Sequence, residues 1–194
     1  SDVCSSDLPD VWHEEVGAVI RGKLIANGGH YSPRNARYDW LTMNHFADMS
    51  SGSFGVTLSN WDDYFMRLGA STTTVLDTST PQFNVLAGGQ IDGPSLGIPA
   101  QGGDSYFMQR FALWTHGNFD QAASMRMSLE HQDPLVTGML DRLGERTAAY
   151  PAGSFSFVNI SDPNVVLWAL KPAEDGIGRG VIARRSEEHT SELQ

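Results

Sequence analysis

The stretch Phe54–Asn60, FGVTLSN, alternates apolar and polar residues with a period of two. Its apolar positions are Phe54, Val56 and Leu58, and glycine, threonine and serine lie between them. Successive side chains of a strand point to opposite faces of a sheet, so this pattern predicts a half-buried β-strand. The pattern therefore predicts a β-rich fold around this stretch.

Further strands are expected on the C-terminal side. Residues 106–115 are rich in aromatics and have the length of a long strand, with Phe107, Phe111 and Leu113 on one face and Trp114 on the other. Near the end, three apolar runs are separated by Pro- and Gly-containing turns, and they read FSFVNIS (155–161), NVVLWALK (164–171) and RGVIAR (179–184). Short runs with this spacing predict a β-meander.

The N-terminal segment 12–24 fits both a helical stripe and a strand. Gly17 and Gly22 would each cost a helix interior about 1 kcal/mol relative to alanine. We therefore expect a strand that ends at residues 27–29, Asn-Gly-Gly.

One short helix is expected over residues 120–131. Asp120 can cap its N-terminus, Ala122, Met125 and Leu129 share a face, and Pro134 follows. Residues 88–104 contain six glycines and two prolines, which predicts a long loop of the kind that often carries function.

Composition excludes several classes of protein. The chain has 194 residues, of which 40% are hydrophobic and 19% charged, as in ordinary folded domains. Its formal charge of -10 has the wrong sign for binding phosphates, so nucleic acid is not an expected partner. No run approaches the roughly 20 apolar residues of a membrane helix, so no membrane partner is expected.

The two ends read as translated sequencing adapter. Residues 185–194, RSEEHTSELQ, translate AGA TCG GAA GAG CAC ACG TCT GAA CTC CAG, and residues 1–8 translate the reverse complement of the same adapter. We therefore treat both ends as scars and exclude them from fold reasoning. They carry five acidic residues and one arginine, which leaves a charge of -6. Cys4, the only cysteine, lies in a scar, and a cysteine-free segment favours a reducing, cytoplasmic compartment.

Several motifs follow one another along the chain: ARYDWLTMNHFADMS (36–50), FGVTLSN (54–60), a Gly/Pro loop ending in QGGD (101–104), FALWTHG (111–117), HQDPLV (131–136) and NVVLWALKPAEDG (164–176). In this order they resemble the C-terminal region of glycoside hydrolase family 38 α-mannosidases. The last motif resembles the signature Ala-Leu-Lys followed by Glu-Asp-Gly. The resemblance covers almost all of residues 9–184.

The resemblance implies the fold and the domain organisation. The fold is expected to be mostly β, an antiparallel β-sandwich of the galactose-mutarotase-like supersandwich type with one short helix. Residues 9–150 would form the family's C-terminal β-sandwich and 151–184 would begin a terminal β-domain. In that family the catalytic aspartate and the zinc ligands lie in an N-terminal barrel, which this chain lacks.

The expected substrate-binding residues lie at a strand end or in the long loop, where polar side chains can face a ligand: Asn60, Asp92, Gln101 and Asp104. The alternative is that they serve turn chemistry. Four aromatic residues could stack on sugar rings, although most are expected in the core: Trp40, Trp61, Tyr64 and Trp114.

No catalytic or metal site is expected in this chain. Glycoside hydrolysis generally needs two carboxyl groups that flank the bond, and the chain offers only adjacent pairs, which are expected in solvated turns and edges: Glu14-Glu15, Asp62-Asp63 and Glu174-Asp175. The sequence His131-Gln132-Asp133 superficially matches a zinc motif, but a histidine at a helix end is the expected interpretation. His13, His30, His45 and His116 show no ligand spacing.

The sequence therefore predicts a non-catalytic fragment of an α-mannosidase that packs on a missing N-terminal barrel. The whole enzyme would hydrolyse terminal α-mannosides of mannose-containing carbohydrates, with zinc in the missing catalytic domain, and the fragment alone would be inactive. A free-standing carbohydrate-binding module and a purely structural sandwich are the alternatives.

Overall fold

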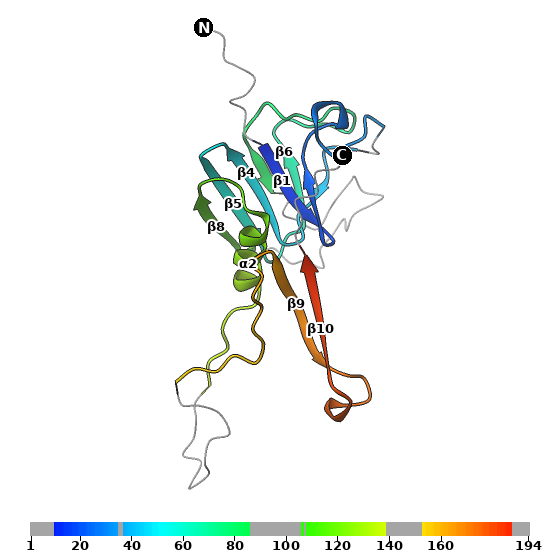
Figure 1. The fold of residues 1–194 in the computed structure, drawn as a ribbon. Coiled ribbons are helices and arrows are strands. Elements are labelled where there is room, and N and C mark those ends of the chain that lie inside the picture. The colour runs from blue at the N-terminus through cyan, green and yellow to red at the C-terminus, as the bar shows by residue number, and fades with distance from the viewer. Residues whose placement is uncertain (1–9, 35–36, 86–105, 107, 139–152, 188–194) are drawn as a thin grey trace. The chain divides into compact units, whose positions relative to one another are not determined.

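The computed structural model describes residues 10–34, 37–85, 106, 108–138 and 153–187. The chain divides into two units, Ser1–Gln132 and Asp133–Gln194, which is an earlier division than the expected boundary at residue 150. Over the described residues the fold is mostly β, with antiparallel sheets and one α-helix (Figure 1). The expectation of a mostly β, antiparallel class with one short helix is confirmed.

The first unit is built on a five-stranded sheet in the order β2-β1-β4-β5-β8, in which every neighbouring pair is antiparallel. Figure 1 shows β1, β4, β5 and β8 side by side. The strands span Asp10–Glu15 (β1), Ala18–Arg21 (β2), Phe46–Ser51 (β4), Phe54–Asn60 (β5) and Phe111–His116 (β8). The fold-defining stretch thus forms β5, between β4 and β8, and β8 begins later than the strand expected over 106–115.

The single strand expected over residues 12–24 is instead a hairpin of β1 and β2. Val16 and Gly17 form its two-residue turn with φ of 50° and 87°, the pair of positive values that a type I′ turn requires. The Glu14 carboxylate accepts a hydrogen bond from the Gly17 N–H. Gly17 therefore reverses the chain, whereas we had placed it within one strand. A short 3-10 turn, η1 (Ile25–Asn27), follows β2.

A smaller sheet packs on one face of the five-stranded sheet. It contains β3 (Leu41–Thr42), β6 (Phe65–Leu68) and β7 (Phe83–Val85) in the order β3-β6-β7, with antiparallel pairing. Apolar side chains of both sheets and of the connections between their strands form one buried core: Val11, Tyr31, Tyr38, Leu41, Met43, Ala47, Leu58, Met66 and Leu68. Two antiparallel sheets thus enclose the main core of this unit.

The opposite face of the five-stranded sheet carries the helix α2 (Gln121–Gln132). Asp120 accepts a hydrogen bond from the Ala123 N–H at 2.9 Å, as expected of an N-terminal cap. Ala122 and Met125 are buried, whereas Leu129 is only partly buried and Ser124 and Ser128 are buried instead.

These serines are buried because the sheet face beneath α2 is polar. Asp48 is fully buried, and its carboxylate accepts hydrogen bonds from Thr57 Oγ1 at 2.5 Å and from His116 Nε2 at 2.6 Å. The Thr57 hydroxyl lies 3.0 Å from the Ser124 hydroxyl of α2. This Asp48 network, defined by Asp48, Ser50, Thr57, His116 and Ser124, joins three strands to the helix.

A buried histidine lies on the other face of β1. His13 Nδ1 lies 2.6 Å from the Thr42 carbonyl, an acceptor, and Nε2 lies 2.9 Å from the Tyr31 hydroxyl. The ring is therefore neutral, with its proton on Nδ1 and with Nε2 accepting from Tyr31. Burial lowers the pKa of His13, because a buried imidazolium would lose its hydration.

This histidine predicts a loss of stability in mild acid. The unfolded chain binds a proton at His13 below about pH 6.5, whereas the folded chain does so only at a lower pH. The contribution of His13 is therefore present above pH 6.5 and lost as the pH falls toward the folded pKa, by at most about 1.4 kcal/mol per pH unit. Urea unfolding from pH 7.5 to 5 should show a steeper loss for the wild type than for His13→Gln. Parallel profiles would contradict this assignment.

The second unit contains one described hairpin. The strands β9 (Val165–Pro172) and β10 (Val181–Glu187) pair antiparallel, and the 3-10 turn η2 (Ile177–Arg179) lies between them. The strands expected over 164–171 and 179–184 are thus present, but described residues 155–161 form no strand, so the expected meander is a hairpin. The pairing continues past Arg184 after a register shift, and Arg185 pairs with Leu167. Residues 185–187, interpreted above as adapter sequence, therefore form the end of β10.

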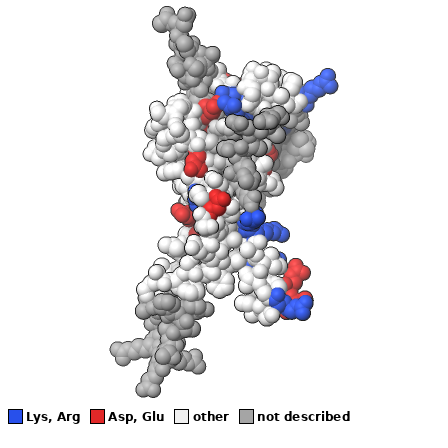
Figure 2. Space-filling model, viewed as in Figure 1, with Lys and Arg blue, Asp and Glu red and all other residues white. Residues whose placement is uncertain are grey.

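Charges are mixed on the surface seen in Figure 2, where acidic and basic side chains are interspersed among uncharged ones. The described residues on that face form no broad basic area of the kind that nucleic-acid binding needs. Within the described part of the chain, no helix has the length and apolar character needed to cross a membrane.

Candidate functional site

An open cleft of about 400 Å³ lies at one end of the first unit. Three chain segments that are distant in sequence form it: the connection from β3 to β4, the connection from β5 to β6, and the last residue of α2. Its lining consists of two aromatic rings, one imidazole and two amides, contributed by Asn44, His45, Trp61, Tyr64 and Gln132. We call this the aromatic–amide cleft.

Asn60 holds two of these segments together. It is fully buried at the end of β5, where its amide nitrogen donates to the Met43 carbonyl at 3.1 Å and its amide oxygen accepts from the Asp63 N–H at 2.7 Å. Its own N–H donates to the His45 carbonyl at 3.0 Å. Asn60 was expected to bind substrate, but in this structure its side chain serves the turn beneath the cleft.

His45 is oriented by a buried carboxylate. The Glu14 side chain is fully buried and accepts hydrogen bonds from His45 Nδ1 at 2.7 Å and from the His45 N–H at 3.1 Å. A carboxylate that accepts from Nδ1 keeps a proton on that nitrogen, so Glu14 fixes the orientation of the His45 ring. The expectation that Glu14 lies in a solvated turn is wrong, because β1 places its side chain inside the unit.

The Trp61 ring packs against two charged or polar side chains. The Arg110 guanidinium lies over its ring, 3.9 Å from the ring centroid, and the His131 ring meets it at 86° with centroids 5.5 Å apart. Asp62 pairs with Arg110 through two hydrogen bonds, of 2.9 and 2.7 Å, and this pairing holds the pKa of Asp62 below its ordinary value. Arg110 is therefore neutralised where it borders the cleft.

Tyr64 presents the more open of the two aromatic rings. The residue is 52% exposed, although its main chain is fixed by a hydrogen bond of 2.9 Å from the Met43 N–H to its carbonyl. Its neighbour Asp63 points away from solvent, with one carboxyl oxygen buried without a hydrogen-bond partner, and burial raises the pKa of Asp63. The half-exposed ring of Tyr64 thus lines the cleft, and its main chain is tied to Met43.

Gln132 brings the end of α2 into the cleft. Its amide nitrogen donates to the Asn44 carbonyl at 3.1 Å and also to the Asn60 carbonyl. These two bonds orient the amide, so its carbonyl oxygen is the atom that can accept from a ligand. His131 lies at the helix terminus, as the sequence predicted, and its Nδ1 lies 2.9 Å from the Ser59 hydroxyl.

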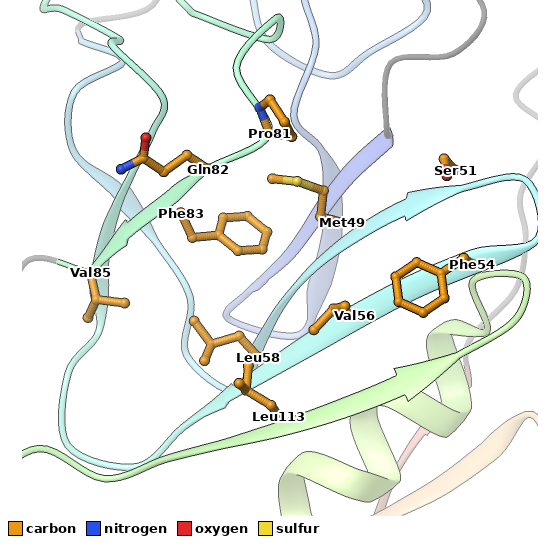
Figure 3. Close-up of a pocket in the computed structure, with 10 residues that line it drawn as sticks. All are labelled: Met49, Ser51, Phe54, Val56, Leu58, Pro81, Gln82, Phe83, Val85 and Leu113. Atoms are coloured by element: carbon orange, nitrogen blue, oxygen red, sulfur yellow. The ribbon is translucent and has the colours of Figure 1, made fainter.

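A second, larger cavity of about 640 Å³ opens between the two sheets. Figure 3 shows Phe83 and Val85 of β7 on one side, with Val56, Leu58 and Leu113 of the five-stranded sheet on the other. Two polar residues, Ser51 and Gln82, belong to its lining. This cavity continues the apolar core outward and offers few groups that could orient a polar ligand.

The other residues predicted to contact a sugar lie partly outside the described residues, partly in packing contacts and partly in the cleft. Asp92, Gln101 and Asp104 lie outside the described residues. Trp40 packs edge-on against Phe65 with centroids 5.4 Å apart, and Trp114 packs against His116 at 4.9 Å. Of the four aromatics considered for sugar stacking, Trp61 and Tyr64 line the cleft.

Five of the residues that build or support the cleft were not predicted as site residues from the sequence: Glu14, Asn44, His45, Arg110 and Gln132. The signal that could have found them is weak, because Glu14 and His45 lie 31 residues apart and Gln132 and Asn44 lie 88 apart. Comparison of the chain with protein families, with curated proteins and with solved structures finds no match.

Proposed function

We propose that this chain is part of the C-terminal, non-catalytic β-sandwich region of a glycoside hydrolase of the family 38 α-mannosidase type. In this proposal the sandwich is of the galactose-mutarotase-like supersandwich type. The chain supplies scaffold and part of a sugar-contacting rim, and it packs on the catalytic barrel of the whole enzyme. Hydrolysis of terminal α-mannosides belongs to that whole enzyme.

The positions of the resembling motifs support the proposal. FGVTLSN forms β5 between β4 and β8, and FALWTH forms β8 beside it. The motif that begins at His131 coincides with the end of α2, and VVLWALKP forms β9. The motifs thus coincide with elements of the fold, as expected if they are structural signatures of a sandwich.

The observation that carries the proposal is the aromatic–amide cleft. A pyranose ring presents an apolar face of C–H groups and a rim of hydroxyls, so its binding sites combine a flat aromatic ring with amides and other orienting polar groups. The cleft brings together two aromatic rings, an imidazole and two amides in about 400 Å³. Small-molecule sites typically span about 300–1,000 Å³.

Zinc does not fit the residues present. Within the described part of the chain, no three histidine, cysteine, aspartate or glutamate side chains are grouped as a metal site requires. In this proposal the zinc of the family binds in the catalytic domain, and no residue of this chain takes part in chemistry at the metal.

One observation favours a second candidate, a free-standing carbohydrate-binding module. The first unit, Ser1–Gln132, has a buried core of its own and contains every residue that lines the cleft. A unit of this kind could bind sugar without a barrel beside it.

Calorimetric titration and an activity assay on the purified chain test the proposal together. Methyl α-D-mannopyranoside should bind saturably, whereas 4-nitrophenyl α-D-mannopyranoside should not be hydrolysed with or without added zinc, because the family's nucleophile is absent. Turnover by the pure chain would contradict a non-catalytic role. Binding of other pyranosides but not of mannosides would favour the free-standing module.

A further inference from the structure

We infer that the aromatic–amide cleft is a binding site for one neutral pyranose ring, with the Tyr64 ring as its stacking platform. The inference rests on the proposed function for the expectation that the ligand is a saccharide, and it names the residues and the ligand class.

Tyr64 is the platform because its ring is open while Trp61 is already engaged. The Arg110 guanidinium covers one face of the Trp61 ring, 3.9 Å from the centroid, and the His131 ring packs perpendicular to it. Tyr64 is 52% exposed, and the hydrogen bond from Met43 holds its main chain in place. A main chain that is already hydrogen-bonded needs less ordering when a ligand stacks on the ring it carries.

The polar groups around Tyr64 are fixed in advance. Glu14 sets the proton of His45 on Nδ1, and the Asn44 and Asn60 carbonyls orient the Gln132 amide. The cleft therefore offers an acceptor at the Gln132 carbonyl oxygen, together with the amide of Asn44. Such a set matches adjacent hydroxyl groups, which both donate and accept hydrogen bonds.

The charges at the cleft favour a neutral ligand. Among the described residues at this site, Arg110 is the neighbouring cation, and Asp62 pairs with it through two hydrogen bonds. The Glu14 charge is buried behind His45, with which it pairs. A uronate or a sugar phosphate would therefore meet no unpaired cation there, so a neutral hexopyranose fits better than an acidic one.

The test is titration calorimetry of the full chain with methyl α-D-mannopyranoside, methyl α-D-glucopyranoside and methyl β-D-glucuronide. Tyr64→Ala should weaken binding of the preferred neutral pyranoside by about tenfold or more, since a stacked ring is lost. Tyr64→Phe should stay within about threefold of the wild type, whereas Tyr64→Leu, which keeps apolar bulk without a flat ring, should resemble the alanine variant. Asn44→Ala should weaken binding by about two- to tenfold, the effect of one hydrogen bond.

The matched control is Phe54→Ala, which removes another half-exposed aromatic ring from the same unit, outside the cleft lining. It should leave affinity unchanged, and thermal unfolding of every variant checks that the fold is retained.

Tighter binding of the glucuronide than of both neutral pyranosides would overturn the neutral-ligand assignment. Mannoside binding that survives Tyr64→Ala would overturn this inference and leave the proposed function standing. Tyr64-dependent binding of the glucoside without any mannoside binding would overturn the mannosidase assignment alone, and no binding by the wild type would overturn both.

Discussion

Asp48→Ala is expected to lower the free energy of unfolding of the first unit by about 3–5 kcal/mol, the usual cost of removing one partner of a buried ion pair. Asp48 is fully buried and the His116 side chain is 5% exposed. His116 Nδ1 lies 3.0 Å from the Gly117 carbonyl, an acceptor, and Nε2 lies 2.6 Å from Asp48. Without Asp48, the polar groups of His116 and Thr57 would lose their shared acceptor inside the unit.

Urea unfolding followed by tryptophan fluorescence measures this loss, in a Trp168→Phe background so that the signal comes from the first unit. The matched control is Asp10→Ala, because Asp10 also pairs with basic side chains but is 33% exposed. Exposed pairs contribute about 1 kcal/mol or less. Equal losses for the two variants would show that burial of Asp48 does not govern its contribution.

A double variant separates the pair from its two members. Asp48→Asn with His116→Gln replaces the carboxylate and the imidazole by two amides that can bond to each other. The double variant should lose less stability than the two single variants lose in sum. In the double variant the two amides are partners for each other, so neither is left as an uncompensated buried group. Additive losses would show that the two side chains do not act as a pair.

Phe46→Ala is expected to cost about 3–5 kcal/mol, the range for truncating a buried aromatic ring. Phe46 is fully buried on the face of β4 that also carries Asp48. The centroid of its ring lies 6.3 Å from that of Phe119, a residue just before the start of α2. The Phe119 ring in turn stacks on Trp12, with centroids 5.1 Å apart. The cavity left by the truncation should also loosen the start of α2.

The same unfolding assay measures the stability loss, and hydrogen exchange of the α2 amides measures the loosening. Phe54→Ala is the control, since Phe54 is 57% exposed on the adjacent strand and surface changes usually stay within about 0.5 kcal/mol. Phe46→Leu, which keeps most of the volume, should lose less than Phe46→Ala. An α2 exchange rate unaffected by Phe46→Ala would contradict the packing role of this ring.

The candidate site could be predicted only in part. Trp61 and Tyr64 were recognised as aromatics able to stack on sugar, because residue type alone carries that property. Asn60 was assigned to the ligand because it ends a strand, but its neighbours use its amide to join two loops. Nothing local in the sequence indicates that the Glu14 carboxylate reaches His45, because β2, η1 and β3 lie between the two residues along the chain.

By itself the sequence determined the local structure: the period-two strand at Phe54–Asn60, the capped helix after Asp120 and the paired runs that became β9 and β10. Backbone preference and side-chain alternation act over a few residues, so a short window contains them. Only the tertiary structure decided which faces are buried. Thr57 and Ser59 of β5 are fully buried beneath α2, whereas Phe54 on the apolar face is 57% exposed. Burial depends on which segment packs against each face, and that partner lies many residues away.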